Sequence, residues 1–74
     1  NILLVDSLDQ PGVIGNIGIA LGKREINIGN MQFGRDQKGG KSLCILQLDT
    51  IPAPEVLDEL KRLPHVNSVQ LIQP

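Results

Sequence analysis

The order of apolar and polar residues along the chain predicts six short elements, and the period of the pattern separates strands from helices. An apolar run over residues 2–5 indicates a strand with at least one buried face. The spacing then changes, since Val13, Ile17 and Leu21 fall on one stripe of a helix. Pro11 suits the start of this helix, because proline lacks an N–H that would be unpaired there.

The rest of the chain predicts three more strands and a second helix. Residues 26–36 read as a strand whose apolar rhythm slips near Gly29 and Asn30, which predicts a bulge or kink at that point. A hairpin loop over residues 36–40 leads to a strand over residues 42–48. The last two elements are a helix whose core-facing stripe is Val56, Leu57, Leu60 and Leu63, and a strand over residues 66–72.

This order of elements is β-α-β-β-α-β, which predicts an α+β protein with the ferredoxin-like arrangement. Two helices are expected to cover one face of a four-stranded antiparallel sheet. The opposite face also carries apolar side chains, since residues 43–46 do not alternate as a solvated strand would. We therefore expect a second copy of the chain, or a neighbouring domain, to bury part of this surface.

Length and charge exclude several classes of partner. The 74 residues make one domain over 1–74, and the first residue is Asn1, so we expect a piece of a longer polypeptide. Seven basic and eight acidic residues are dispersed and give a net charge of -1, so no basic patch is available for nucleic acid or a membrane surface. No apolar run approaches the roughly 20 residues of a membrane span, and a cytoplasmic location is the default expectation.

The reactive residues argue against catalysis by this chain alone. Cys44 is the one cysteine, which excludes an internal disulfide and a cysteine-rich metal site, and its apolar strand favours a buried hydrophobe over a nucleophile. His65 lies in a turn without an obvious partner. Phe33 is the one aromatic residue, so the base-stacking surface of RNA-recognition modules with this topology is missing. A stand-alone catalyst fits the sequence least.

Three glycines, Gly15, Gly18 and Gly22, lie inside the first predicted helix. This position excludes a dinucleotide-binding loop, whose glycines precede and open a helix. Because each glycine costs up to about 1 kcal/mol relative to alanine, we expect close packing of this helix against the sheet, a partner or a ligand. Gly15 lies one turn from the helix start, where access to a ligand is expected.

The loop before the first helix and Asn27 form the candidate binding site. A helix start presents unpaired N–H groups and a partial positive charge, which suits a carboxylate. Asp9 is expected to be the N-cap, close to the N–H of Gly12, and its carboxylate could receive an ammonium group. The Asn27 amide can donate and accept. Together these groups describe a receptor for a free amino acid, although a purely structural role for Asp9 and Asn27 accounts for the pattern equally well.

Two segments resemble the signature segments of the ACT domain family. One covers residues 9–15, with a Pro-Gly-Val-Ile core at 11–14, and the other covers residues 26–31. The similarity extends over essentially the whole chain. It is greatest to the C-terminal regulatory domain of bacterial-type D-3-phosphoglycerate dehydrogenase, through residues 31–41 and 52–64. The resemblance implies the βαββαβ fold and a regulatory role at domain–domain interfaces.

The resemblance also implies a small-molecule amino-acid effector, L-serine, which slows an NAD-dependent enzyme of serine biosynthesis. No cofactor is expected in this segment, because NAD would bind catalytic domains that precede Asn1. A homodimer or homotetramer is implied, with effector pockets between the first helix of one copy and the start of the second strand of the other. The expected effector-binding residues are Ser7, Asp9, Gln10, Pro11, Gly12, Val13, Ile14, Gly15, Asn27 and Ile28.

The loop departs from the family's serine-binding pattern at two positions. Ser7 stands where serine-sensitive members carry histidine, and Asp9 stands where they carry asparagine. The pocket is therefore open to another amino acid or to a purely structural role. Two alternatives to serine sensing remain: a ligand-free module that only assembles the same enzyme, and the ACT domain of iron–sulfur L-serine dehydratase, whose loops are similar.

Overall fold

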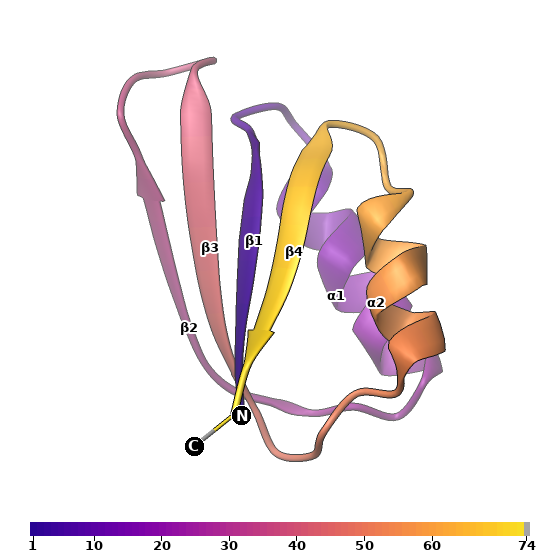
Figure 1. Cartoon of the computed structure of the whole chain (residues 1–74). Helices are drawn as coiled ribbons and strands as arrows, with labels where there is room; N and C mark the ends of the chain where they lie inside the picture. Colours follow the sequence, from indigo (N-terminus) through magenta and orange to yellow (C-terminus); the bar gives the residue numbers. More distant parts are fainter. Residues whose placement is uncertain (74) are drawn as a thin grey trace.

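Six elements follow one another in the predicted order in the computed structural model, which describes residues 1–73. The strands form one antiparallel sheet and both helices lie against one of its faces (Figure 1), so the predicted ferredoxin-like α+β fold is confirmed. The elements are β1 (Ile2–Leu8), α1 (Val13–Lys23), β2 (Ile28–Arg35), β3 (Lys41–Leu48), α2 (Pro54–Lys61) and β4 (Val66–Ile72).

The strand order β2-β3-β1-β4 places β1 inside the sheet and β2 and β4 at its edges. β1 pairs with both of its neighbours, so that Ile2 lies opposite Gln47 on one side and opposite Ile72 on the other. The start of β1 and the end of β4 therefore lie side by side at one end of the sheet (Figure 1). The other end of the sheet carries the β1–α1 turn and the β2–β3 hairpin (Figure 1).

The core lies between the sheet and one stripe of each helix. The stripe predicted for α1 is buried, and Ala20 is added to it. In α2, Val56 and Leu60 are buried as predicted. Leu57 and Leu63 keep partial exposure, and Leu63 lies beyond the end of the helix. The buried apolar residues are Leu3, Val5, Val13, Ile17, Ala20, Leu21, Cys44, Leu46, Leu48, Val56 and Leu60.

A bulge interrupts β2 near its start. The register against β3 passes from Ile28 opposite Leu48 to Asn30 opposite Gln47, which leaves Gly29 without a partner. The bulge predicted from the slipped apolar rhythm is therefore confirmed. It allows the two halves of β2 to turn apolar side chains toward the same face of the sheet.

Beyond the bulge, β2 is an edge strand on which neither helix packs closely. Phe33 lies opposite the buried Cys44, and Met31 lies opposite the buried Leu46. Because directly opposed residues share a face of the sheet, both side chains point to the helix side. Met31 and Phe33 nevertheless remain 43% and 40% exposed, so this part of the helix-side face is open.

The other face of the sheet is also apolar in part. Ile2, Leu8, Leu43 and Ile72 are between 39% and 42% exposed. Such side chains along three strands form a surface that a partner could cover. Burial of this face by a second copy or a neighbouring domain stays a prediction.

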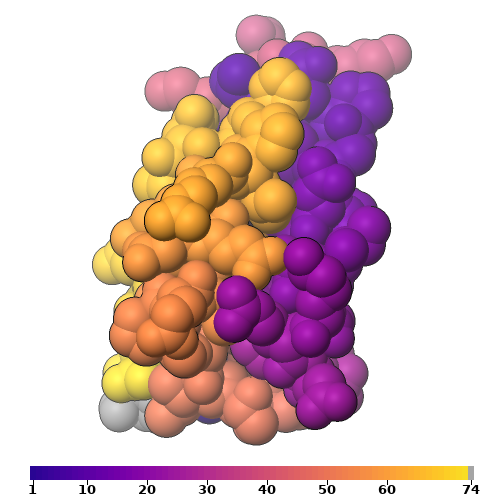
Figure 2. Space-filling model, turned by 90° about the vertical axis from the view of Figure 1, so that its right-hand side faces the viewer, coloured from indigo at the N-terminus to yellow at the C-terminus, as the bar shows by residue number. Residues whose placement is uncertain are grey.

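The glycines of α1 do not serve close packing within the chain. A Cβ built on Gly15, Gly18 or Gly22 would meet no atom within 4 Å. The expectation that they bring α1 close to the sheet is therefore wrong, because the stripe of α1 that contacts the sheet lies on the other side of the helix. Figure 2 shows α1 beside α2 at the surface of the molecule, with its outer side uncovered. Contact with a partner or a ligand remains as the predicted role of these glycines.

Candidate functional site

The turn between β1 and α1 depends on Gly12. This residue is the N-cap of α1 and has a φ of +89°, in the left-handed region that favours glycine. Its carbonyl oxygen accepts the N–H of Asn16 at 2.8 Å, which starts the helical ladder. No side chain caps the helix, so the prediction that Asp9 is the N-cap is wrong.

Asp9 instead joins the turn to the β2–β3 hairpin. Its Oδ2 accepts hydrogen bonds from Nη1 of Arg35 at 2.8 Å and from the Gly39 N–H at 3.0 Å. The Gly39 N–H, and after it Arg35, hold the pKa of the Asp9 carboxyl below its ordinary value. These tertiary partners replace the local cap that the sequence suggested. Because Arg35 offsets its charge, Asp9 is a weaker receptor for an ammonium group than an unpaired carboxylate would be.

A cavity of about 140 Å³ opens beside the first turn of α1. The backbone N–H groups of Ile14 and Gly15 belong to this turn and donate to no group within residues 1–73. They carry a partial positive charge and can bind a carboxylate. The volume is well below the roughly 300–1,000 Å³ of sites for drug-sized ligands, so the cavity suits a smaller molecule. The residues that line it are Leu8, Asp9, Gln10, Gly12, Val13, Ile14, Gly15, Phe33 and Ser42.

Most of the predicted loop residues meet at this cavity. Asp9, Gln10 and all four residues from 12 to 15 line it. Pro11 lies on the other side of the loop, where it lines a neighbouring hollow together with Arg35 and Lys38. The loop residues on both sides of Pro11 therefore form one wall of the cavity, and this wall includes the first turn of α1 with the free N–H groups of Ile14 and Gly15.

Ser7 lies behind this wall, although the residue opposite it in the sheet reaches the cavity. The register places Ser7 opposite Ser42. The two Oγ atoms are 2.9 Å apart, and the Ser42 hydroxyl also donates to the Ser7 carbonyl oxygen at 3.3 Å. Ser7 is 1% exposed, so its hydroxyl is satisfied inside the protein and is not free for a ligand in this conformation.

Asn27 and Ile28 lie at the other end of β2, away from the cavity. The five steps along the strand from Ile28 to Phe33 span roughly 16 Å at about 3.3 Å per residue. Ile28 is half-buried and packs against the core. Asn27 is exposed, and its Nδ2 donates to Oδ2 of Asp49 at 2.9 Å. A site that combines Asn27 with the cavity therefore needs a second copy of the chain.

Leu8, Phe33 and Ser42 line the cavity but are absent from the predicted site. A signal for Ser42 was present in the sequence, because it shares the even-numbered phase of Cys44 and therefore faces the helices. Phe33 could not be assigned in the same way. Its position beside the cavity depends on β2 lying next to β3 and on the direction of both strands.

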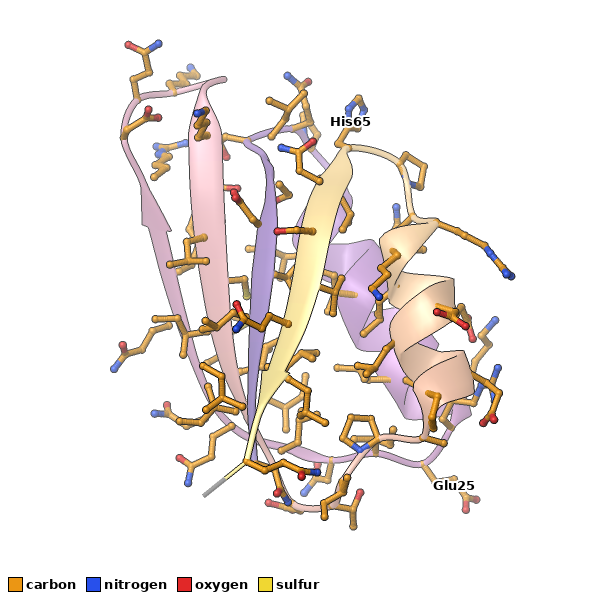
Figure 3. The ribbon with its side chains drawn as sticks, viewed as in Figure 1. Glu25 and His65 are labelled. Carbon is orange, nitrogen blue, oxygen red and sulfur yellow. The ribbon has the colours of Figure 1, made fainter. Side chains whose placement is uncertain are left out.

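Other reactive groups form no second site. His65 is exposed in the turn before β4, and its side chain points away from the molecule (Figure 3). Cys44 is buried, and this burial raises the pKa of its thiol. Within the described part of the chain, no group of three or more His, Cys, Asp or Glu side chains is placed to hold a metal ion. Neither described helix is long and apolar enough to cross a membrane.

Known proteins resemble this chain over nearly its whole length. The family model of the ACT domain matches residues 1–65. A D-3-phosphoglycerate dehydrogenase of Methanocaldococcus jannaschii is 38% identical over 71 residues, which cover 96% of this chain but 14% of that protein. A probable L-serine dehydratase, beta chain, of Bacillus subtilis is 33% identical, over 95% of this chain and 32% of that protein.

A solved structure has the same fold. The ACT domain from the GTP pyrophosphokinase of Chlorobium tepidum aligns with a TM-score of 0.72 at 18% identity, covering 93% of this chain and 91% of that one. At this identity the likeness concerns the fold alone. Because the family match spans most of the chain and its fold agrees with the observed sheet and helices, the chain belongs to the ACT domain family.

Proposed function

We propose that this chain is an amino-acid-sensing regulatory domain whose effector is L-serine. The observation that carries the proposal is the cavity beside α1, where the N–H groups of Ile14 and Gly15 have no partner in the described chain. A carboxylate can accept from both groups, and a volume of about 140 Å³ suits a free amino acid. One relative is named for L-serine as its substrate, which supports serine over other amino acids.

A second copy of the chain would complete the effector site. β2 is an open edge strand of eight residues with Met31 and Phe33 exposed on its helix-side face. If two such edges pair antiparallel about a two-fold axis, the start of one β2 lies beside the end of the other. Asn27 of one copy would then approach the cavity of its partner. An effector that contacts both copies favours one arrangement of the assembly and regulates it by population shift.

The parent protein proposed here is a cytoplasmic, NAD-dependent D-3-phosphoglycerate dehydrogenase that forms a homodimer or homotetramer. Its relative from Methanocaldococcus jannaschii matches over most of this chain, which covers 14% of that protein. Catalysis and NAD binding would therefore reside in other domains. This domain would slow the enzyme when L-serine accumulates.

Calorimetric titration of the chain with L-serine tests the proposal. We expect saturable heat, a higher melting temperature in the presence of L-serine and a dimer in gel filtration at the titration concentration. Asn27→Ala should abolish binding and leave the far-ultraviolet circular dichroism unchanged. Asn67→Ala, at an exposed asparagine of β4, is the matched control and should bind as the unmodified chain does. No heat and no thermal shift with any amino acid would rule out sensing.

Assembly without a ligand is the second candidate. The open edge of β2 and the exposed apolar residues of the outer sheet face favour it. If the chain is a dimer in gel filtration but binds no amino acid in the titration, assembly alone is its function.

The ACT domain of an iron–sulfur L-serine dehydratase is the third candidate, favoured by the relative in Bacillus subtilis. The remaining sequence of the parent protein separates the two enzymes. A Gly-x-Gly-x-x-Gly segment after a strand indicates the dehydrogenase, whereas cysteines that hold an iron–sulfur cluster indicate the dehydratase.

A further inference from the structure

We propose that Asp49 positions the Asn27 amide so that this pair receives the ammonium group of the effector, an assignment that rests on the proposed amino-acid sensing. Two hydrogen bonds join Asn27 and Asp49. Nδ2 of Asn27 donates to Oδ2 of Asp49 at 2.9 Å, and the Asp49 N–H donates to the Asn27 carbonyl oxygen at 3.1 Å. Both residues are exposed, so the pair lies at the surface where β2 begins and β3 has ended.

The Asp49 carboxylate decides the orientation of the Asn27 amide. An ionised carboxylate only accepts hydrogen bonds, so the amide nitrogen of Asn27 faces Asp49 and Oδ1 faces away from it. Oδ1 then offers an acceptor to a ligand. The negative charge of Asp49 attracts a cation and repels a second carboxylate nearby. The pair therefore selects a positively charged donor, which in a free amino acid is the ammonium group.

Gly29 leaves the space that this arrangement needs. It is the unpaired residue of the β2 bulge, and a Cβ built on it would lie 3.0 Å from Oδ1 of Asp49. Its φ is not in the left-handed region, so the backbone conformation itself does not require glycine. An alanine side chain would instead press on the exposed Asp49 carboxylate, which would have to shift by a few tenths of an ångström.

The two ends of the effector are thereby assigned to different copies. The N–H groups at the start of α1 take the carboxylate, and the Asn27–Asp49 pair of the other copy takes the ammonium group. Asp9 is not needed for this role, since its Oδ2 already accepts from Arg35 and Gly39.

The test compares L-serine with 3-hydroxypropionate, which lacks the ammonium group, in titrations of the whole chain. Asp49→Asn should weaken L-serine binding about tenfold or more, because a charge-assisted hydrogen bond is lost, and should leave the affinity for 3-hydroxypropionate unchanged. Gly29→Ala should act in the same direction while keeping the charge. Asp58→Asn removes an exposed charge from α2 and is the matched control, with no change for either ligand.

Each outcome separates this assignment from the function on which it rests. An unchanged L-serine affinity in Asp49→Asn, or an equal loss for both ligands, would overturn the role of Asp49 and leave amino-acid sensing intact. No binding of any amino acid to the unmodified chain would overturn both. The side-chain NH₂ resonances of Asn27 give a readout without ligand, since they should shift in Asp49→Asn and not in Asp58→Asn. Unshifted resonances would refute the contact itself.

Discussion

Ser42→Ala should destabilise the domain more than Ser7→Ala, although the two hydroxyl groups share one hydrogen bond. Each hydroxyl has a single hydrogen, and that of Ser42 is directed to the Ser7 carbonyl oxygen at 3.3 Å. Either hydroxyl can donate in the 2.9 Å contact between the Oγ atoms, and with the Ser42 hydrogen on the carbonyl oxygen the donor in that contact is Ser7. In Ser42→Ala the Ser7 hydroxyl, at 1% exposure, loses the acceptor that it has in the described chain. In Ser7→Ala the Ser42 hydroxyl keeps its carbonyl acceptor.

The magnitudes follow from this difference. Leaving a buried hydroxyl unsatisfied costs about 1–3 kcal/mol, whereas losing one ordinary hydrogen bond costs about 0.5–1.5 kcal/mol. We expect the free energy of unfolding to fall by about 2 kcal/mol in Ser42→Ala and by about 1 kcal/mol in Ser7→Ala. The double variant replaces both partners by apolar groups and should cost no more than Ser7→Ala. The coupling free energy is then on the order of 2 kcal/mol.

Urea denaturation followed by far-ultraviolet circular dichroism measures these changes, because the chain has no Trp or Tyr for fluorescence. The variants should be compared without effector and at one protein concentration, since ligand binding and assembly add to stability. Ser68→Ala, at an exposed serine of β4, should stay within about 0.5 kcal/mol of the unmodified chain. Equal costs for the two single variants, or an additive double variant, would refute this direction of the hydrogen bonds between the two serines.

Gly15→Ala should raise the stability of the domain by up to about 1 kcal/mol in thermal denaturation, because alanine favours a helix and the added methyl group meets no atom within 4 Å. The same substitution should weaken effector binding, because Gly15 lines the cavity. Gly18→Ala should give the same gain with unchanged affinity, and a loss of stability in either variant would contradict the open surroundings of α1. Asp9→Asn should be less stable than the unmodified chain near neutral pH. The pKa of Asp9 in the folded chain lies below 3.8, so the ionised carboxyl stabilises the folded chain above that value, and this stabilisation disappears as the pH falls through the folded pKa. A difference in urea midpoint between the two chains that persists in strong acid would contradict this. Cys44, buried and with a raised pKa, should react with a thiol reagent only as fast as the domain opens, and rapid labelling of the folded chain would show that the thiol is accessible.

Periodicity predicted the elements of this domain because burial determines most of them. The α1 stripe and the inward phase of β3 are patterns of local spacing, and both describe residues that the structure buries. The bulge at Gly29 was equally local, since one extra residue in a strand is what shifts its apolar side chains from even to odd positions. The N-cap was different. Whether Asp9 caps α1 or binds Arg35 depends on where the β2–β3 hairpin lies, which no local spacing reports.

The candidate site likewise has one part that the local sequence predicts and another that depends on the fold. Its loop wall could be predicted because helix starts carry unpaired N–H groups wherever they occur. Phe33 could be placed beside the cavity only once the strand order was known. The separation of Asn27 from the cavity, and its contact with Asp49, are likewise properties of the folded chain. These contacts join residues that are distant in the sequence, and a single sequence gives little information about which distant residues meet.

Loss of the one codon for Gly29 would shorten β2 without moving either half of the strand out of register. Ile28 would still lie opposite Leu48 and Asn30 opposite Gln47, now as consecutive pairs. Most deletions within a strand instead turn every following side chain to the wrong face. Pairing within the sheet therefore does not itself require this residue, and its retention in a lineage would point to another demand, either the bend that the bulge gives the edge strand or the contact with Asp49 at the surface.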